Sequence, residues 1–278
     1  MTIDLHLHTN ASDGRSSPAE LVDLAAARGL RVMAVTDHDT TAAVAEVRTL
    51  ADGHGIEAVP GIEITAVEGG RDIHVLGYFF DPDDAALSTF LAAARADRIT
   101  RVEAIAAKLA ALGMPVDLTS ILTEARRHTG RSVGRPSIAT AMIAAGYVKN
   151  KTDAFDKWLG QDGPVFVARS GATPERVIET LHAAGGLVSL AHPGRTRIDA
   201  RIPALREAGL DALEVFHSDH DNGMVERYVG LARKLGLLVT GGSDFHGDST
   251  HGLVPGAAGL PDAEWVRLSA ERARHAAR

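Results

Sequence analysis

The segment "IDLHLHTNASDG", residues 3–14, alternates apolar and polar side chains over its first six positions. Successive side chains of a β-strand point to opposite faces, so His6 and His8 are expected to project from the same face. Two imidazoles placed in this way can reach one metal ion, and Asp13 follows five residues after His8. A single pair of this kind is more often two ordinary strand residues, so the rest of the sequence decides between the two interpretations.

The composition narrows the class of protein. The chain has 278 residues, a formal net charge of −7 and no cysteine. It is long enough for one large domain, or for one domain with an insertion. The absence of cysteine excludes disulfides and thiolate ligands and predicts a cytoplasmic protein. No signal peptide or membrane-spanning run is expected. The negative charge argues against binding of long nucleic acids, which requires clustered lysines and arginines.

Seven short apolar runs predict strands, and several of them are followed by helical signals. Ser17 with Pro18 and Glu20 forms a capping box, and Thr173 repeats the device before a second helix. Strands alternating with helices predict parallel strands covered by helices, an α/β fold. The predicted strands lie near residues 3–8, 31–36, 56–64, 73–80, 186–191, 210–216 and 236–241.

Residues 94–163 do not follow this alternation of strands and helices. Segments such as "ADRITRVEAIAAKLAALG" and "RPSIATAMIAAGYV" favour helices, and no strand is expected between them. We therefore predict an α/β domain formed by residues 1–93 and 164–278, with a helical insertion at 94–163 between the fourth and fifth strands.

Histidines and carboxylates recur at the predicted strands. Each has an ordinary explanation by itself: Asp37 could cap a helix, Glu63 could pair with an arginine, and His192 could be a loop residue. These explanations are independent, and all must hold together for a metal site to be absent. The sequence therefore predicts a metal site. Besides the first strand, the residues concerned are His38, Glu63, His74, His192, Asp244 and His246.

These motifs together resemble the polymerase and histidinol phosphatase (PHP) family of metal-dependent phosphoesterases. They are the first segment, "TDHD", "GIE", a strand histidine, "AHPGR" and "GSDFH". The resemblance implies a distorted (β/α)7 barrel, similar to a TIM barrel, and three divalent ions. It also implies that the insertion at 94–163 covers the substrate. It implies one ion held by His6, His8, Glu63 and Asp244, a second held by Asp13, His38 and His246, and a third held by His74, His192 and a bridging Glu63.

The chemistry of this ligand set agrees with the resemblance. Six imidazoles and three carboxylates without sulfur suit manganese, iron, zinc or cobalt better than magnesium or calcium. Manganese is the leading choice, with iron or zinc as alternatives. Three divalent ions and three carboxylates leave a charge of about +3, which attracts phosphate. A bridging hydroxide would be the nucleophile. Many relatives have histidine where this chain has Asp13, and the nucleotide-phosphatase branch has aspartate there.

Several further residues are candidates for the site, and most of them have two possible roles. Asp37, and in the same way Asp39, could orient a ligand histidine or cap a helix. His217 and His220 could donate a proton or contact phosphate, or could be plain loop histidines. Arg135 and Arg195 are candidates for phosphate binding. Arg98 and Arg101 could share that task or form a solvated helix face.

The leading prediction is a phosphatase that removes the 3′-phosphate of nucleoside 3′,5′-bisphosphates, a small phosphorylated nucleotide substrate. The alternatives are a phosphodiesterase acting on a ribose cyclic phosphate and a 5′→3′ exonuclease acting on short RNA. A non-catalytic metal-binding module is the alternative outside the enzymes.

Overall fold

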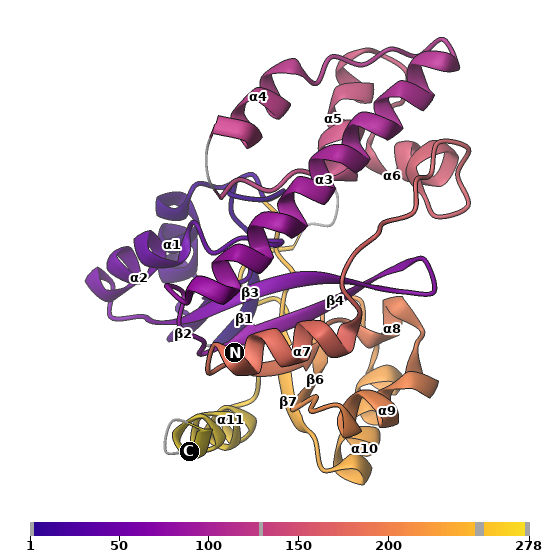
Figure 1. The fold of residues 1–278 in the computed structure, drawn as a ribbon. Coiled ribbons are helices and arrows are strands. Elements are labelled where there is room, and N and C mark those ends of the chain that lie inside the picture. The colour runs from indigo at the N-terminus through magenta and orange to yellow at the C-terminus, as the bar shows by residue number, and fades with distance from the viewer. Residues whose placement is uncertain (1–2, 128–129, 248–252, 276–278) are drawn as a thin grey trace.

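The computed structural model describes residues 3–127, 130–247 and 253–275, with side chains through residue 272 (Figure 1). One seven-stranded sheet follows the order of the chain from first strand to last. All seven predicted strands are confirmed. They are β1 (Ile3–Leu7), β2 (Val32–Val35), β3 (Glu57–Glu68), β4 (Arg71–Tyr78), β5 (Leu187–Leu190), β6 (Ala212–His217) and β7 (Leu238–Gly242).

The helices lie outside the sheet and above one end of it (Figure 1). The predicted capping box at the start of the first helix is present: Ser17 accepts from the backbone of Glu20, and Glu20 accepts from that of Ser17. The α-helices are α1 (Pro18–Ala27), α2 (Val44–Gly53), α3 (Ala85–Ala111), α4 (Thr119–Arg127), α5 (Arg135–Ala144), α6 (Lys151–Ala154), α7 (Pro174–Ala183), α8 (Pro193–Thr196), α9 (Ile202–Glu207), α10 (Asn222–Leu235) and α11 (Asp262–His275). A π-helical turn, η1 (Phe155–Leu159), follows α6, and a 3₁₀ turn, η2 (Asp199–Arg201), precedes α9.

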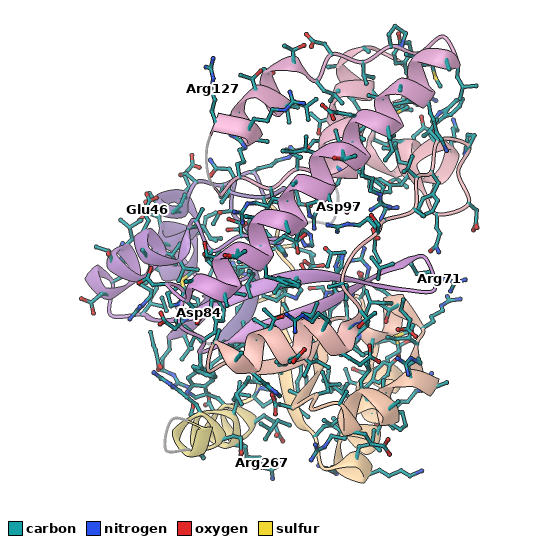
Figure 2. All side chains as sticks on the ribbon, viewed as in Figure 1. Glu46, Arg71, Asp84, Asp97, Arg127 and Arg267 are labelled. Atoms are coloured by element: carbon teal, nitrogen blue, oxygen red, sulfur yellow. The ribbon has the colours of Figure 1, made fainter. Side chains whose placement is uncertain are left out.

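The expectation of parallel strands throughout is wrong for β4, which runs antiparallel to both β3 and β5. The cause is a two-residue turn, because Gly69 and Gly70 adopt φ values of +56° and +78°. Two successive residues at positive φ are typical of the tight turn of a β-hairpin. Arg71, the first residue of β4, lies at the free end of this hairpin (Figure 2).

The sheet curls into a nearly closed barrel because its first and last strands meet. The backbone of Asp244 donates to the carbonyl of His6 at 2.9 Å, and that of His8 donates to the carbonyl of Phe245 at 3.0 Å. Gly242 is required here, because a Cβ atom would lie 2.3 Å from the backbone nitrogen of His6. The predicted class, an α/β barrel of seven strands with a helical insertion, is confirmed.

Asp4 fastens this closure with its side chain. It is fully buried, and its carboxylate accepts from the backbone nitrogen of Ser243 at 2.9 Å, from the Ser243 hydroxyl at 2.6 Å and from the backbone nitrogen of Gly256 at 2.7 Å. Ser243 directly precedes the predicted ligand Asp244. The buried side chain of Asp4 therefore supplies some of the hydrogen bonds that a strand ladder between β1 and β7 would otherwise provide.

The insertion packs around apolar side chains of its own. Besides the core of the barrel, a separate buried cluster is contributed by α3 to α6 and the segments between them. The predicted boundary at residue 94 falls inside α3, whose first turns pack on the barrel core through Leu87 and Leu91. One continuous helix thus runs from the barrel into the insertion. Among the described residues, no helix has both the length and the apolar character needed to cross a membrane.

Candidate metal centre

The nine predicted metal ligands converge at one end of the barrel. Glu63 lies in the middle of β3 and is fully buried, and the other eight residues surround it from β1, β4 and the loops after β1, β2, β5 and β7. The structure brings together His6, His8, Asp13, His38, Glu63, His74, His192, Asp244 and His246, all within one network of imidazole and carboxylate contacts.

The first predicted group, His6, His8, Glu63 and Asp244, is compact. The Nε2 atoms of the two histidines lie 3.1 Å apart. Each lies 3.4 Å from Oε2 of Glu63, and they lie 3.3 and 3.1 Å from Oδ1 of Asp244. Ligand atoms about 2.1 Å from a tetrahedral ion are about 3.4 Å from one another. Four donor atoms at these spacings therefore fit around a single ion.

Glu214 sets the tautomer of His6. Its Oε1 lies 2.8 Å from Nδ1 of His6, and its Oε2 accepts from the backbone nitrogen of His192 at 2.8 Å. A proton on Nδ1 leaves the lone pair of Nε2 directed at the ligand cluster, an arrangement typical of metal-binding histidines. Sequence analysis gave Glu214 no role. Its signal was a carboxylate in the middle of an apolar strand.

The second predicted group gathers around Asp13. Nε2 of His246 lies 3.2 Å from Oδ1 of Asp13, and Nε2 of His38 lies 3.7 Å from Oδ2. His8 faces the same carboxylate from 3.9 Å through Nδ1, so the structure adds it to this cluster. Nδ1 of His246 lies 2.8 Å from the carbonyl of Asp244, so Nδ1 carries a proton and Nε2 is the nitrogen available to an ion.

The third predicted group shares Glu63. Its Oε1 lies 2.8 Å from Nδ1 of His74 and 3.1 Å from Nε2 of His192, while Nδ1 of His38 lies 3.0 Å from its Oε2. His38 and Glu63 are close, yet neither of these two buried atoms makes a hydrogen bond. Two buried polar atoms that lie this close without a hydrogen bond are costly unless another group, such as a cation, satisfies them. The residues therefore fit divalent ions.

Metal binding to this centre is expected to release protons. Burial acts to lower the pKa of His246, but Asp13 and Asp244 outweigh it and raise the pKa to about 10. The pKa of His6 is shifted in the same direction. Burial acts to lower it, but Glu214, Asp244 and Glu63 outweigh burial and raise the pKa well above the usual value. Both imidazoles are thus protonated in the metal-free protein at neutral pH, and an ion must displace those protons.

Calorimetric metal titrations in buffers of different ionisation enthalpy should show this release, and affinity should rise with pH. Because the folded pKa of His246 exceeds the unfolded value, its contribution to metal-free stability is fully present below pH of about 6.5 and is lost as pH rises toward 10. Metal-loaded protein should lack this loss. Equal proton release at pH 6 and pH 10 would contradict the assignment.

The three predicted catalytic residues have different surroundings. Asp37 accepts from the backbone and hydroxyl of Thr9 and from the hydroxyl of Ser12, at 2.6–2.8 Å. Asp37 does not cap α2, whose N-cap is Ala43, and no histidine is among its described hydrogen-bond partners. It instead holds the loop that carries Asp13.

The two candidate histidines after β6 also differ. His217 lines the cavity; its Nδ1 accepts from the backbone of Asp219 at 3.1 Å, so its Nε2 carries a proton, 3.4 Å from Oδ2 of Asp244. His220 is not part of the cavity lining. Its ring nitrogens lie 2.8 Å from the carbonyl of Val215 and 3.1 Å from the backbone nitrogen of Gly194. His220 thus fastens the loop after His192.

All four predicted arginines line the same cavity as the metal ligands. Arg101 and Arg135 both bond Oδ2 of Asp72, at 2.9 and 3.0 Å. Arg98 bonds Asp39, so the solvated-face interpretation of Arg98 and Arg101 is wrong: both side chains are about nine-tenths buried. Arg195 is half exposed at the cavity mouth, 3.2 Å from Oδ2 of Asp244.

Sequence analysis missed one cavity arginine, Arg169. It lies in the segment that returns from the insertion to the barrel, and its side chain is 2% exposed. It pairs with Asp39 at 3.3 Å and with Asp97 at 3.2 Å. No local sequence motif marks it, because its partners come from distant parts of the chain.

Comparison with known proteins agrees with the geometry. The family model for the PHP domain matches residues 4–99. A 3′,5′-nucleoside bisphosphate phosphatase from Chromobacterium violaceum is 32% identical over 88% of this chain and 87% of that protein. A 5′-3′ exoribonuclease from Haemophilus influenzae is 34% identical over 87% and 89%. A phosphoribosyl 1,2-cyclic phosphate 1,2-diphosphodiesterase from Eggerthella lenta is 31% identical over 89% and 95%.

A solved structure shows the same fold. It is a protein from Bifidobacterium adolescentis described as a metal-dependent phosphoesterase, with a TM-score of 0.85, 33% identity, and coverage of 97% of this chain and 95% of that one. The three relatives are named for different phosphoester substrates, and this chain covers 87–95% of the length of each. The chain belongs to the PHP family and is a metal-dependent phosphoesterase.

Proposed function

We propose that this protein removes the 3′-phosphate of nucleoside 3′,5′-bisphosphates, giving a nucleoside 5′-monophosphate and phosphate. One observation carries the proposal: a single cavity of about 400 Å³ is lined by metal ligands on one side and by arginines of the insertion on the other. Its volume is typical of a small-molecule site. A nucleotide with two phosphates has a charged group for each side.

The arginine side favours a second phosphate. Four arginines (Arg98, Arg101, Arg135 and Arg169) are paired with only three carboxylates (Asp39, Asp72 and Asp97). Burial lowers the pKa of Arg135; Asp72 opposes this, and the neighbouring guanidinium groups lower it further. A bound phosphate would relieve that repulsion. Apolar side chains such as Val102, Ile105 and Phe155 line the same cavity and could contact a base.

The metal ions would supply charge neutralisation and an activated water at the phosphoryl group, held by the nine ligands above. We propose three ions, with manganese as the leading metal. The water oxygen bonds to phosphorus, the bond from phosphorus to the 3′-oxygen breaks, and that oxygen takes up a proton. Nε2–H of His217, a residue that lines the cavity, is the group we assign as proton donor. Arg195 would contact the phosphoryl oxygens.

Exonucleolytic cleavage of short 5′-phosphorylated RNA is the second candidate. The RNA would lie in the site as the bisphosphate does. The arginines would hold its 5′-phosphate, and water would attack the phosphorus bonded to the first 3′-oxygen. The exoribonuclease at 34% identity favours it. Hydrolysis of a ribose cyclic phosphate would use the metal ligands in the same way but would depend less on the arginines.

The cytoplasmic location expected from the lack of cysteine is part of the same proposal.

Manganese-loaded protein should release phosphate and AMP from adenosine 3′,5′-bisphosphate. Loaded protein that leaves this compound intact, while cleaving 5′-phosphorylated RNA or a cyclic phosphate, would sink the leading proposal. Gel analysis of short RNA with and without a 5′-phosphate separates the second candidate.

Arg135→Met is expected to raise KM for the bisphosphate about 10- to 100-fold with a smaller change in kcat, because a charge-assisted hydrogen bond to the second phosphate is lost. Arg131→Met is the matched control. Arg131 lies four residues earlier, pairs with Glu124 and is not part of the cavity lining. Equal KM values for the two variants would remove Arg135 from the binding site.

A further inference from the structure

Asp39 is a buried carboxylate that belongs to none of the ligand clusters. It directly follows the ligand His38, is fully buried and has a φ of +53°. Its backbone nitrogen donates to the carbonyl of Glu63 at 2.9 Å, and its Oδ1 accepts from the backbone nitrogen of Thr65 at 2.8 Å. Asp39 is therefore fixed to the strand that carries the central ligand of the metal centre.

The remaining acceptors of Asp39 receive arginines from both connections of the insertion. Arg98 and Arg169 share its Oδ2, and Arg95 donates to its carbonyl at 3.0 Å. Arg95 and Arg98 lie one turn apart on α3, where the chain enters the insertion, whereas Arg169 lies where the chain returns. Asp97, midway along α3 (Figure 2), joins the two connections through Arg169 at 3.2 Å.

Arg98 extends the contact into the insertion. Its Nη2 donates to the hydroxyl of Thr65 at 2.7 Å, and its Nη1 donates to the carbonyl of Val133 at 3.3 Å. Val133 lies two residues before Arg135. Since Nε is bonded to Asp39, all three nitrogens of this guanidinium hold protein groups. Arg98 is thus committed to structure, although it lines the cavity.

The contact is ionic and buried, because the guanidinium groups of Arg98 and Arg169 meet at Oδ2 of Asp39 and all three side chains are largely shielded from solvent. A buried ionic contact joined by good hydrogen bonds fixes relative position more strongly than it stabilises the fold, because desolvation offsets much of the attraction. This property suits a joint between two parts of an active site.

We propose that Asp39 and Arg98 are positioning residues that form an electrostatic strut, holding the insertion in register with the metal centre. The strut connects the ligand His38 with the segment that carries Arg135. It rests on the proposed function in one respect: a substrate with two phosphates must span both parts. Small phosphoesters that contact only the metal side do not need this register.

The test compares Asp39→Asn, Arg98→Met and the double variant, each loaded with manganese. The strut predicts that each single variant raises KM for adenosine 3′,5′-bisphosphate by at least about tenfold, with a much smaller effect on p-nitrophenyl phosphate. The double variant should be no worse than the more affected single variant, because both changes break one contact. Arg98→Lys keeps the charge without the three-way contact and should also raise KM.

A second readout does not depend on the substrate. Amide exchange across residues 130–144 should become about tenfold faster in the strut variants than in the wild type. The matched control is the exposed pair of Arg31 and Asp262, changed to methionine and asparagine, which should alter neither readout. If the wild type does not cleave the bisphosphate, the proposed function fails, and the exchange experiment still decides the strut.

Three outcomes would overturn the strut. If Arg98 binds the substrate directly, Asp39→Asn will leave KM unchanged or lower it, because an arginine is released. If the pair contributes only to stability, the melting temperature will fall while KM and amide exchange at 130–144 stay as in the wild type. Strictly additive effects in the double variant would show two independent roles.

Discussion

Glu63→Gln is expected to remove most of the bound metal and to lower phosphoesterase turnover at least about a thousandfold, since bound ions supply several kcal/mol of transition-state stabilisation. The reason is its position. One oxygen faces His6, His8 and His38, and the other faces His74 and His192. Glutamine keeps the shape but removes the charge that the first and third ligand groups share. Elemental analysis of the purified variant, followed by steady-state kinetics, provides the measurement.

Glu68→Gln is the matched control for this experiment. Glu68 lies five residues later on the same strand and pairs with Arg201 at 2.7 Å, and its side chain is 30% exposed. It should retain full metal content and activity. A Glu63→Gln protein with unchanged metal content and turnover would refute the metal centre described above.

Asp4→Ala is expected to lower the free energy of unfolding of the metal-free protein by about 3–5 kcal/mol, because several buried donors lose their acceptor. The donors are the backbone and hydroxyl of Ser243 and the backbone nitrogen of Gly256. Such a loss is a large share of the stability of an ordinary domain, about 5–15 kcal/mol. Urea unfolding in the presence of a chelator measures it without a contribution from bound ions.

Two further variants make this result interpretable. Asp4→Asn keeps one acceptor oxygen and should lose about half as much. Asp23→Ala, at a side chain 73% exposed, should change stability by less than about 0.5 kcal/mol. If Asp4→Ala unfolds at the same urea concentration as the wild type, Asp4 does not fasten the barrel.

The clustering of histidines and carboxylates could be predicted because each of these residues belongs to a short local pattern. The alternation around His6 and His8, and the placement of His38, His192 and Asp244 at strand ends, are visible without knowledge of the fold. The shared end of the barrel then brings these residues together. The positions of the strands could be predicted equally well, since a buried strand of an α/β protein is a short apolar run bounded by turns.

The residues that position these side chains could not be predicted from local patterns. Asp4 bonds Ser243, which is 239 residues away, and Glu214 bonds His6 across 208 residues. Such contacts depend on closure of the barrel and leave no periodic trace in the sequence. Arg98 had a helical pattern that could not distinguish a solvated face from a buried one. The antiparallel β4 did have a signal, Gly69-Gly70 between two apolar runs, which indicates a hairpin.

The reversed direction of β4 explains the length of α3. Because β4 ends at the end of the barrel opposite the metal centre, the chain must travel back along the whole barrel before it can cover the site (Figure 1). The 27 residues of α3 span about 40 Å at 1.5 Å per residue. The helix is therefore also a ruler. Adding one residue before Arg95 would rotate its arginines by about 100° around the axis, and adding a whole turn would move them by about 5.4 Å along it, so both changes would break the contacts with Asp39. Chimeras that exchange caps between relatives should preserve this spacing.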